Sequence, residues 1–132
     1  METIFEVYTD GSCWPNPGKG SYAYVVLKDE RLHHKASQSV MNTTNNKMEL
    51  QAILSSLEYF QQPTKIKIYS DSLYAINSAL KKFNGAKNKD LIKKIRDFNQ
   101  YHSVEYKWVR GHSGIYWNEF VDNLAERARI NS

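Results

Sequence analysis

Alternating apolar and polar positions at the start of the chain predict three successive β-strands. Residues 3–9 are apolar on both alternating faces, which is typical of a central strand that is covered on both sides. Residues 21–28 and 31–41 also have strand patterns and are joined by a short polar turn, and the turn formers of residues 11–18 precede them. We expect the first strand to end before Asp10. Together the three strands predict an antiparallel meander.

The apolar period then changes from that of strands to that of helices. Apolar residues from Leu50 to Leu57 follow the i, i+3, i+4, i+7 spacing of an amphipathic helix, which we expect to end before Pro63. The remaining elements are predicted as a strand at 65–70, helices at 72–83 and 88–101, a strand at 104–109, and a last helix with an apolar side from Trp117 to Ala128. Strands connected through helices imply parallel pairing. We therefore predict an α/β fold, a five-stranded mixed sheet with helices on both faces.

Length and composition narrow the class of protein. The 132 residues leave room for one domain, residues 1–132, and 41% hydrophobic residues are enough to bury a core. The longest apolar run, residues 22–27, is far shorter than the ~20 residues of a membrane-spanning helix. The N-terminus lacks the pattern of a secretory signal, and the one cysteine, Cys13, cannot form an internal disulfide. We expect a cytoplasmic protein with no membrane partner.

Positive charge is concentrated in one segment. The chain has 18 basic and 14 acidic residues, and residues 81–96 hold seven basic residues against one acid, Asp90. Such a cluster is either a solvated helix face or a surface that binds a polyanion such as nucleic acid. The sequence leaves both interpretations open.

Four carboxylates are placed where they can meet. Asp10 and Asp71 directly follow predicted strands, Glu49 opens a helix, and Asp122 lies beside the apolar side of the last helix. In open α/β sheets, ligands bind beyond the carboxyl ends of parallel strands. Taken singly, each acid has an ordinary explanation, because it can cap a turn or complement a helix dipole. Taken together, the four would repel one another strongly unless a cation lies between them.

An all-oxygen site of this kind favours Mg²⁺ or Mn²⁺. Zinc would require His or Cys ligands, and the four histidines of the chain lack metal-ligand spacing. Carboxylates that leave water on the metal suit a two-metal arrangement, which activates water and stabilises the leaving oxygen of a phosphodiester. The predicted chemistry is phosphodiester hydrolysis.

Five motifs in order resemble the signature of type 1 ribonuclease H. They are residues 8–12 (YTDGS), 43–50 (TTNNKMEL), 70–72 (SDS), 108–114 (WVRGHSG) and 118–122 (NEFVD). The resemblance spans nearly the whole chain and implies the ribonuclease H-like fold. It also implies that the metal-binding catalytic carboxylates are Asp10, Glu49, Asp71 and Asp122. His112 is similar to the family's mobile histidine, which assists proton transfer or product departure, and Glu119 matches an acidic position near the second metal.

The resemblance also implies a substrate groove. Asn16, Asn45 and Asn46 would line it on the RNA strand, where they can contact 2′-hydroxyls, although their ordinary role is in turns and caps. Thr44 and Asn88 match a pocket for a phosphate of the DNA strand.

The chain departs from the family pattern at three places. Asn42 stands where some relatives have arginine, Leu73 stands where bacterial relatives often have glutamine, and the basic, Trp-rich protrusion of many relatives is absent. The basic residues of the 81–96 segment are candidates to replace the charge of that protrusion. We assign Lys81, Lys82, Lys87 and Lys89 to substrate binding on this hypothesis.

The resemblance implies an endonuclease that hydrolyses the RNA strand of RNA/DNA hybrids, leaving 3′-hydroxyl and 5′-phosphate ends. It would use two Mg²⁺ ions, or Mn²⁺, and we expect a monomer. One alternative is a DNA-cutting resolvase or transposase-like nuclease of the same fold, but the residues before Glu49 and the acid Asp122 beside a histidine loop disfavour it. A hybrid-binding module without catalysis is the other alternative. It is disfavoured because four acids without metal would repel a polyanion.

Overall fold

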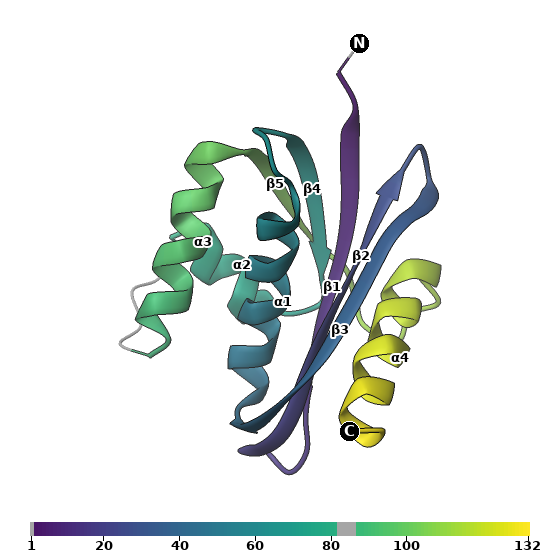
Figure 1. Cartoon of the computed structure of the whole chain (residues 1–132), viewed down its shortest axis with the longest axis vertical. Coiled ribbons are helices and arrows are strands. Elements are labelled where there is room, and N and C mark those ends of the chain that lie inside the picture. The colour runs from purple at the N-terminus through teal and green to yellow at the C-terminus, as the bar shows by residue number, and fades with distance from the viewer. Residues whose placement is uncertain (1, 82–86) are drawn as a thin grey trace.

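A five-stranded sheet in the order β3-β2-β1-β4-β5 forms the middle of the molecule (Figure 1). The computed structural model describes residues 2–81 and 87–132. In chain order the elements are β1 (Ile4–Cys13), β2 (Gly18–Lys28), β3 (Arg31–Thr43), α1 (Asn45–Tyr59), β4 (Lys65–Ser70), α2 (Leu73–Ala79), α3 (Lys89–Tyr101), β5 (Ser103–Trp108) and α4 (Tyr116–Ile130). β1 pairs antiparallel with β2 and parallel with β4, and β4 pairs parallel with β5. The predicted element order and mixed sheet are confirmed.

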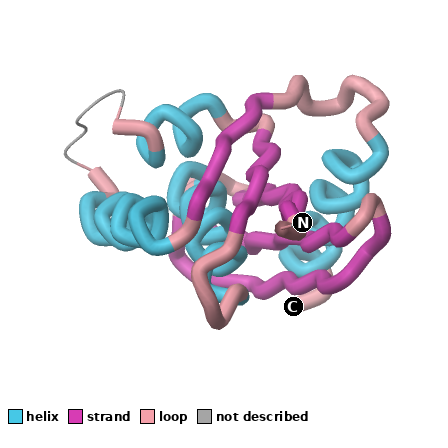
Figure 2. The backbone as a smooth tube through the Cα atoms, turned by 90° about the horizontal axis from the view of Figure 1, so that it is seen from above, coloured by secondary structure: helices cyan, strands magenta, loops and turns pink. Residues whose placement is uncertain are grey.

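Helices cover both faces of the sheet, but unequally. α1, α2 and α3 lie on one side and α4 lies alone on the other, as Figures 1 and 2 show. The larger core joins β1, β2 and β4 to α1 and α3, with Val7, Leu50 and Ile95 fully buried. The smaller core lies under α4 and contains mainly short side chains, such as Ala23 and Ala125. Burial of apolar surface on both faces, about 25 cal/mol per Å², is the main force that holds these layers together.

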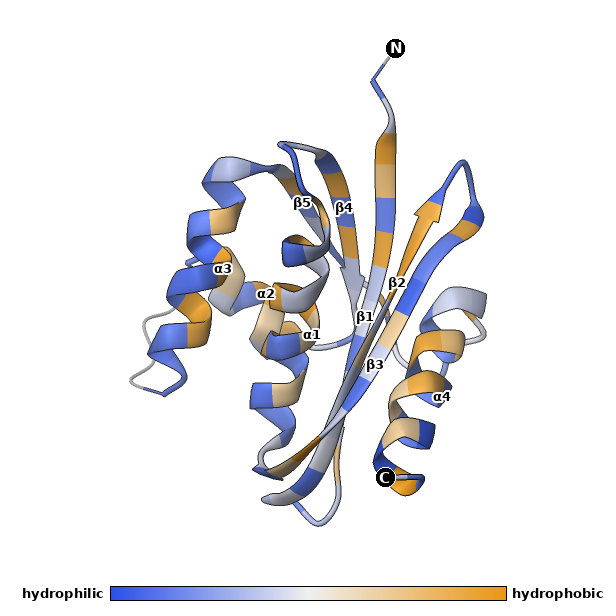
Figure 3. Ribbon diagram, viewed as in Figure 1, coloured by the Kyte–Doolittle hydropathy of each residue, from blue (hydrophilic) through white to orange (hydrophobic). Residues whose placement is uncertain are grey.

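The hydropathy of the ribbon follows these layers. Figure 3 shows hydrophobic stretches on β1, β2 and β4 and along α3 and α4, alternating with hydrophilic ones. In α1 the residues that share one side, Leu50, Ile53 and Leu57, are all fully buried. The apolar spacing read from the sequence therefore faces the sheet, as predicted.

β1 is longer than the sequence pattern predicts. We expected the strand to end before Asp10, but it continues to Cys13. Its parallel pairing with β4 stops at the Tyr8 and Tyr69 partners, whereas its antiparallel pairing with β2 continues as far as Cys13. The turn-like residues 10–13 stay extended because β2 supplies a hydrogen-bonding partner. Asp10 thus lies within a strand, just beyond the last residue that β1 pairs with β4.

The second predicted helix is shorter in the structure. α2 begins after Ser72, whose hydroxyl accepts a hydrogen bond from the Ala75 N–H, and ends at Ala79 rather than at residue 83. Lys81 has a φ of 62°, which is a left-handed conformation incompatible with a continuing helix. The rest of the predicted helix lies outside the described residues. Asn88 precedes α3 and is also left-handed, with a φ of 61°.

Candidate active site

Three carboxylates from three different elements meet at one edge of the sheet. Asp10 comes from β1, Glu49 from the first turns of α1, and Asp71 from the residue directly after β4. One oxygen of each lies within 4.8 Å of the others. Asp10 and Glu49 are almost entirely buried, with 3% and 7% of their surface exposed, and Asp71 is half-buried. The sequence prediction that these acids converge is borne out in the geometry.

Gly11 brings α1 against β1. A Cβ atom at this position would lie 2.5 Å from the backbone nitrogen of Glu49, so only glycine permits the contact. The Gly11 N–H donates a hydrogen bond of 2.8 Å to Oε1 of Glu49. Gly11 therefore allows α1 to pack closely against β1, and its N–H holds the carboxylate of Glu49 beside that of Asp10.

The loop after β5 passes close to Asp71. A Cβ atom at Gly111 would lie 2.7 Å from Oδ2 of Asp71, so a side chain there would push on the carboxylate. The indole nitrogen of Trp108 donates a hydrogen bond of 3.1 Å to the backbone carbonyl of Asp71. β5 and its loop thus fix the position of Asp71 from one side.

Burial and mutual repulsion disfavour the charged forms of these acids. Desolvation raises the pKa of Asp10 well above its ordinary value, and the charge of Glu49 raises it further. The pKa of Glu49 rises from 4.5 to about 8, chiefly through burial and then through the charge of Asp71. Burial also raises the pKa of Asp71. The three ion pairs of described residues, Lys65–Glu2, Lys93–Asp97 and Lys107–Glu105, engage other carboxylates.

α4 adds a fourth acid and an amide. The Asp122 side chain contributes to the raised pKa of Asp10, so this carboxylate acts on the cluster. Asn118, four residues earlier, is 2% exposed and lowers the pKa of Asp71. Its Nδ2 nevertheless has no acceptor at standard hydrogen-bond geometry among the described residues. Sequence reasoning missed Asn118, although it stands in the last of the five motifs.

His112 and Glu119 lie at the margin of the site. His112 is exposed, has a left-handed φ of 56°, and contributes to lowering the pKa of Asp71 electrostatically. Glu119 is exposed in the first turn of α4. The group of carboxylates with mutually close oxygens contains neither Glu119 nor Asp122.

The donor set fits a hard divalent cation. All the close donors are carboxylate oxygens, which Mg²⁺ and Mn²⁺ prefer. Their raised pKa values mean that the surrounding protein does not stabilise their charged forms, which a bound cation would do. Asp10, Glu49 and Asp71 are therefore the residues that would hold such an ion, with Asp122 beside them.

A groove of about 920 Å³ lies beside the N-terminus of α1. The side chains that line it are mostly amides, hydroxyls and amines: Asn16, Pro17, Thr44, Asn45, Asn46, Lys47, Tyr74, Lys87 and Asn88. Five of them were singled out from the sequence as the amide and threonine contacts. The structure thus brings together residues that are up to 72 positions apart in the chain, 16 to 88.

Hydrogen bonds give the groove a fixed shape. The Asn45 N–H donates to Oδ1 of Asn16 at 3.1 Å, and the Lys47 N–H donates to the Thr44 hydroxyl at 3.2 Å. On the far side, Nδ2 of Asn88 donates to the Tyr74 hydroxyl at 3.0 Å. The β1–β2 turn is thereby tied to the start of α1, and the start of α3 is tied to α2.

The predicted lysines are distributed unevenly around the groove. Lys87 lines it, and Lys89 lines an adjoining hollow of about 390 Å³ together with Asn88. Lys81 is exposed after α2, and Lys82 lies outside the described residues. Lys47 lines both hollows and was missed by sequence reasoning, which concentrated on the 81–96 segment.

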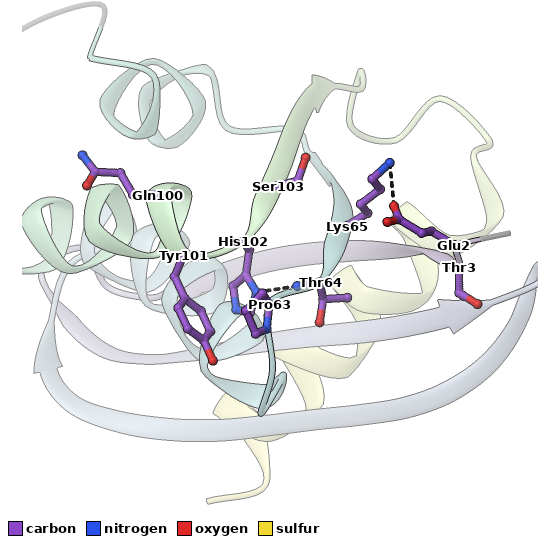
Figure 4. Close-up of a pocket in the computed structure, with 9 residues that line it drawn as sticks. All are labelled: Glu2, Thr3, Pro63, Thr64, Lys65, Gln100, Tyr101, His102 and Ser103. Atoms are coloured by element: carbon purple, nitrogen blue, oxygen red, sulfur yellow. Dashed lines mark hydrogen bonds and ion pairs between the residues drawn. The ribbon is translucent and has the colours of Figure 1, made fainter.

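A separate hollow of about 540 Å³ lies where β4 and β5 begin, at the end of the parallel strands away from Asp71 (Figure 4). His102 is buried there with both ring nitrogens engaged: Nδ1 accepts from the Thr64 N–H at 3.1 Å, and Nε2 lies 3.1 Å from the Leu57 carbonyl. Burial lowers the pKa of His102. This histidine holds the end of α1 to β4 and stands apart from the acids.

Comparison with known proteins identifies the family. The ribonuclease H family model matches residues 2–130. A ribonuclease HI of Haemophilus ducreyi is 41% identical over 138 residues, which cover 95% of this chain and 90% of that protein. Ribonuclease H of Trichodesmium erythraeum is 38% identical over 140 residues, covering 96% of this chain and 88% of that protein.

Solved structures share the fold at low sequence identity. The N-terminal ribonuclease H domain of a Mycobacterium tuberculosis protein has a TM-score of 0.86 at 20% identity, with 98% of this chain and 96% of that chain covered. LC11-RNase H1, solved in complex with an RNA/DNA hybrid, has a TM-score of 0.84 at 20% identity, with 96% and 97% covered. The chain therefore belongs to the type 1 ribonuclease H family and is a nuclease that cleaves the RNA strand of RNA/DNA hybrids.

Proposed function

We propose that Asp10, Glu49, Asp71 and Asp122 hold two Mg²⁺ ions when a hybrid is bound, with Glu119 near the second. The observation that supports this most directly is the set of three carboxylate oxygens within 4.8 Å of one another. Divalent ions in such a site lower the pKa of bound water and stabilise the leaving oxygen of a phosphodiester. The acids supply the negative charge that retains the ions and fixes them relative to the scissile phosphate. Mn²⁺ is an alternative with the same ligand preference.

The products follow from which bond the site cleaves. Attack of water on the phosphorus, with departure of the 3′-oxygen, leaves a 3′-hydroxyl and a 5′-phosphate. His112, which is exposed on its loop and acts electrostatically on Asp71, is the residue that we propose moves a proton or helps the product leave. Its role therefore belongs to turnover rather than to metal binding.

The groove beside α1 is the proposed substrate contact surface. Asn16, Asn45 and Asn46 offer amides to the 2′-hydroxyls of the RNA strand, the group that distinguishes RNA from DNA. Because Oδ1 of Asn16 already accepts from Asn45, the amide of Asn16 retains its two N–H donors for a ligand. Thr44 and Asn88, which both line the groove, are the proposed contacts to a phosphate of the DNA strand.

The lysines near the groove are proposed to supply the charge of the missing protrusion. Lys87 and Lys89 line the groove and the hollow beside it, which favours phosphate contact. Lys93, farther along α3, pairs with Asp97 and fits the solvated helix face. Lys81 and Lys82 complete the proposed set, and their contribution is the least supported by position. Exposed Leu73 offers no amide at its position.

Cleavage of a labelled RNA/DNA hybrid with and without Mg²⁺ tests this function. We expect cuts only in the RNA strand, none after chelation, and none in double-stranded DNA or double-stranded RNA. Cleavage of double-stranded DNA would favour the resolvase-like alternative, and binding of hybrid without any cleavage would favour the non-catalytic module. Mapping of the product ends by phosphatase and ligase sensitivity checks the 3′-hydroxyl and 5′-phosphate.

Three further properties stay predictions: that residues 1–132 act as one catalytic domain, that the protein is a monomer, and that it is cytoplasmic. None of the helices in the described ranges combines the length and hydropathy needed to cross a membrane. Sedimentation with and without a hybrid measures the oligomeric state, and a second copy on the hybrid at one cut site would contradict the monomer.

A further inference from the structure

Two hydrogen bonds join α4 to the sheet. None of the five sequence motifs contains both partners of either bond. The hydroxyl of Ser21 on β2 donates a hydrogen bond to the backbone carbonyl of Ala125. Nε of Arg129, one helical turn later, donates a bond of 2.9 Å to the hydroxyl of Ser12 on β1. These bonds connect residues 104 and 117 positions apart in the chain, so they arise only from the docking of the helix.

The strand register places both bonds in line with the acids. Ser12 and Ser21 are direct partners in the β1–β2 pair, and Asp10 is the partner of Ala23. Because side chains alternate along a strand, Asp10 and Ser12 project from the same face of β1, two residues apart. Facing them on α4, Asp122 precedes Ala125 by three residues, which places the two on one side of the helix.

The fully buried part of the core under α4 is small, and larger residues such as Trp117, Phe120 and Leu124 pack around it partly buried. The fully buried contacts between α4 and the sheet are Ala23, Val25, Val121 and Ala125, whereas the opposite face of the sheet carries a much larger core. Small side chains let the helix backbone approach β2 closely enough for the fully buried Ser21 to reach a carbonyl. The two hydrogen bonds add directional restraints to this packing and tie α4 to defined positions of β1 and β2.

We infer that Ser21 and the Ser12–Arg129 pair are positioning residues that set the place of Asp122 against Asp10. The inference rests on the proposed role of these acids in holding Mg²⁺. If α4 shifts, Asp122 moves relative to Asp10, whose pKa it influences, and the proposed fourth ligand is displaced while the groove beside α1 is unchanged. We call the two hydrogen bonds, Ser21 to the Ala125 carbonyl and Arg129 to Ser12, the α4 clamp. Loss of this clamp should lower metal affinity and turnover and leave hybrid affinity unchanged.

The test compares Ser21→Ala and Arg129→Gln with Ser56→Ala as a matched control. Ser56 is also fully buried and donates to a backbone carbonyl, that of Ile53 at 2.7 Å, but within α1. We expect Ser21→Ala and Arg129→Gln to lower kcat on the order of tenfold with an unchanged KM for hybrid, since small misplacements at a catalytic site cost up to about 10²-fold. They should also raise the Mg²⁺ concentration for half-maximal activity. Ser56→Ala should change only thermal stability.

A second readout does not depend on activity. Mg²⁺ alone should raise the Tm of the parent by binding the folded state, and we expect a smaller rise for both clamp variants than for the Ser56→Ala control. Ser12→Ala should behave like Arg129→Gln, and Ser12→Thr, which keeps the hydroxyl, should restore parent values. If Ser21→Ala fails to fold, the Ser12 and Arg129 variants decide.

Equal kcat, Mg²⁺ midpoint and Mg²⁺-induced Tm rise in clamp and control variants would overturn the inference. Failure of the proposed function is distinguishable, because the parent itself would then not cleave hybrid with Mg²⁺. In that case, the comparison of Mg²⁺-induced Tm rises between clamp and control variants still tests whether the clamp positions the acids.

Discussion

Asp10 is a carboxylate with 3% of its surface exposed and with Glu49, Asp71 and Asp122 as neighbours. In water such an acid is ionised at neutral pH, but here burial and like charges favour its neutral form. In the folded chain, the charged forms of these acids are therefore favourable only when a cation is bound between them. Three predictions follow from single residues of this site.

Asp10→Asn should reduce cleavage to background and stabilise the metal-free protein. The substitution keeps the shape of the side chain but removes a ligand charge and one source of repulsion. We expect a rise in the free energy of unfolding of about 1 kcal/mol in chelator, an ordinary size for a single substitution. Denaturant unfolding with chelator and cleavage assays in saturating Mg²⁺ measure the two effects. Normal turnover of this variant would remove Asp10 from catalysis.

The stability of the metal-free protein should fall as the pH rises. The pKa of Glu49 is 4.5 in its ordinary state and about 8 when folded, so the folded state binds its proton more tightly than the unfolded state. A raised folded pKa contributes stability that is fully present below pH 4.5 and is lost as the pH rises through about 8. Thermal melts in chelator across this window measure the decline.

The matched control for the pH effect is Glu49→Gln, which cannot titrate. Its decline over the same window should be smaller than that of the parent, and added Mg²⁺ should stabilise the parent most at the upper end, where the acids are charged. If the Tm of the parent in chelator does not change with pH, repulsion among the acids does not destabilise the metal-free protein.

His112→Ala should lower kcat without abolishing cleavage. A positioned acid or base contributes about 10²–10⁴-fold, and an exposed residue at the margin of the site should fall at or below the lower end. Rates across the pH range, with the Mg²⁺ midpoint as control, measure the effect. A variant with parent rates at every pH would place His112 outside the mechanism.

The sequence predicted the acids more completely than their surroundings. Asp10, Glu49, Asp71 and Asp122 are recognisable because each occupies a motif position after a predicted strand or on a predicted helix. Asn118 was not recognised, because its importance comes from burial beside Asp71, which no spacing within α4 reveals. Lys47 was missed for a similar reason, since only the folded groove shows which lysine faces it.

At the scale of elements, the contact between α1 and β1 determines whether the site forms. Element order and type could be predicted, because apolar periods report directly on strands and helices. The end of β1 could not, because residues 10–13 are held extended by their pairing with β2 and not by their own preference. Asp10 is therefore more rigidly placed than a residue in a loop after a strand would be.

Gly11→Ala should separate α1 from β1. The added Cβ would lie 2.5 Å from backbone atoms of Met48 and Glu49, which a side-chain rotation cannot relieve. We expect a loss of about 1–3 kcal/mol in the free energy of unfolding, the usual range for overpacking, together with weaker Mg²⁺ stabilisation because Glu49 moves. Urea unfolding and Mg²⁺-dependent Tm measure both. Parent stability would show that the helix shifts without cost.

At the scale of the whole molecule, charge is divided between the acidic site and the basic residues around the groove. The net charge of +4 hides this division. A hybrid is a polyanion, so the basic residues raise its affinity while the acids repel it until cations bind. The charge distribution allowed a polyanion partner as one of two interpretations, and it could not show which lysines face such a partner. Only the fold shows that Lys87 lines the groove, that Lys89 lines the adjoining hollow, and that Lys93 pairs with Asp97.

The double variant Lys87→Ala, Lys89→Ala should weaken hybrid binding in a salt-dependent way. Each lost phosphate contact lowers the slope of log affinity against log salt by about 0.7–0.9. Loss of two contacts would therefore lower this slope by about 1.4–1.8, raise KM, and leave kcat nearly unchanged.

The control is the double variant Lys28→Ala, Arg31→Ala. It removes the same charge from the β2–β3 turn, where these two residues are strand partners away from the groove. A parallel Lys81→Ala, Lys82→Ala variant extends the test to the start of the basic segment. If the Lys87→Ala, Lys89→Ala variant shows the same salt slope as the control, these lysines belong only to a solvated face beside α3. Hybrid binding without the protrusion would then depend on Asn16, Asn45 and Asn88.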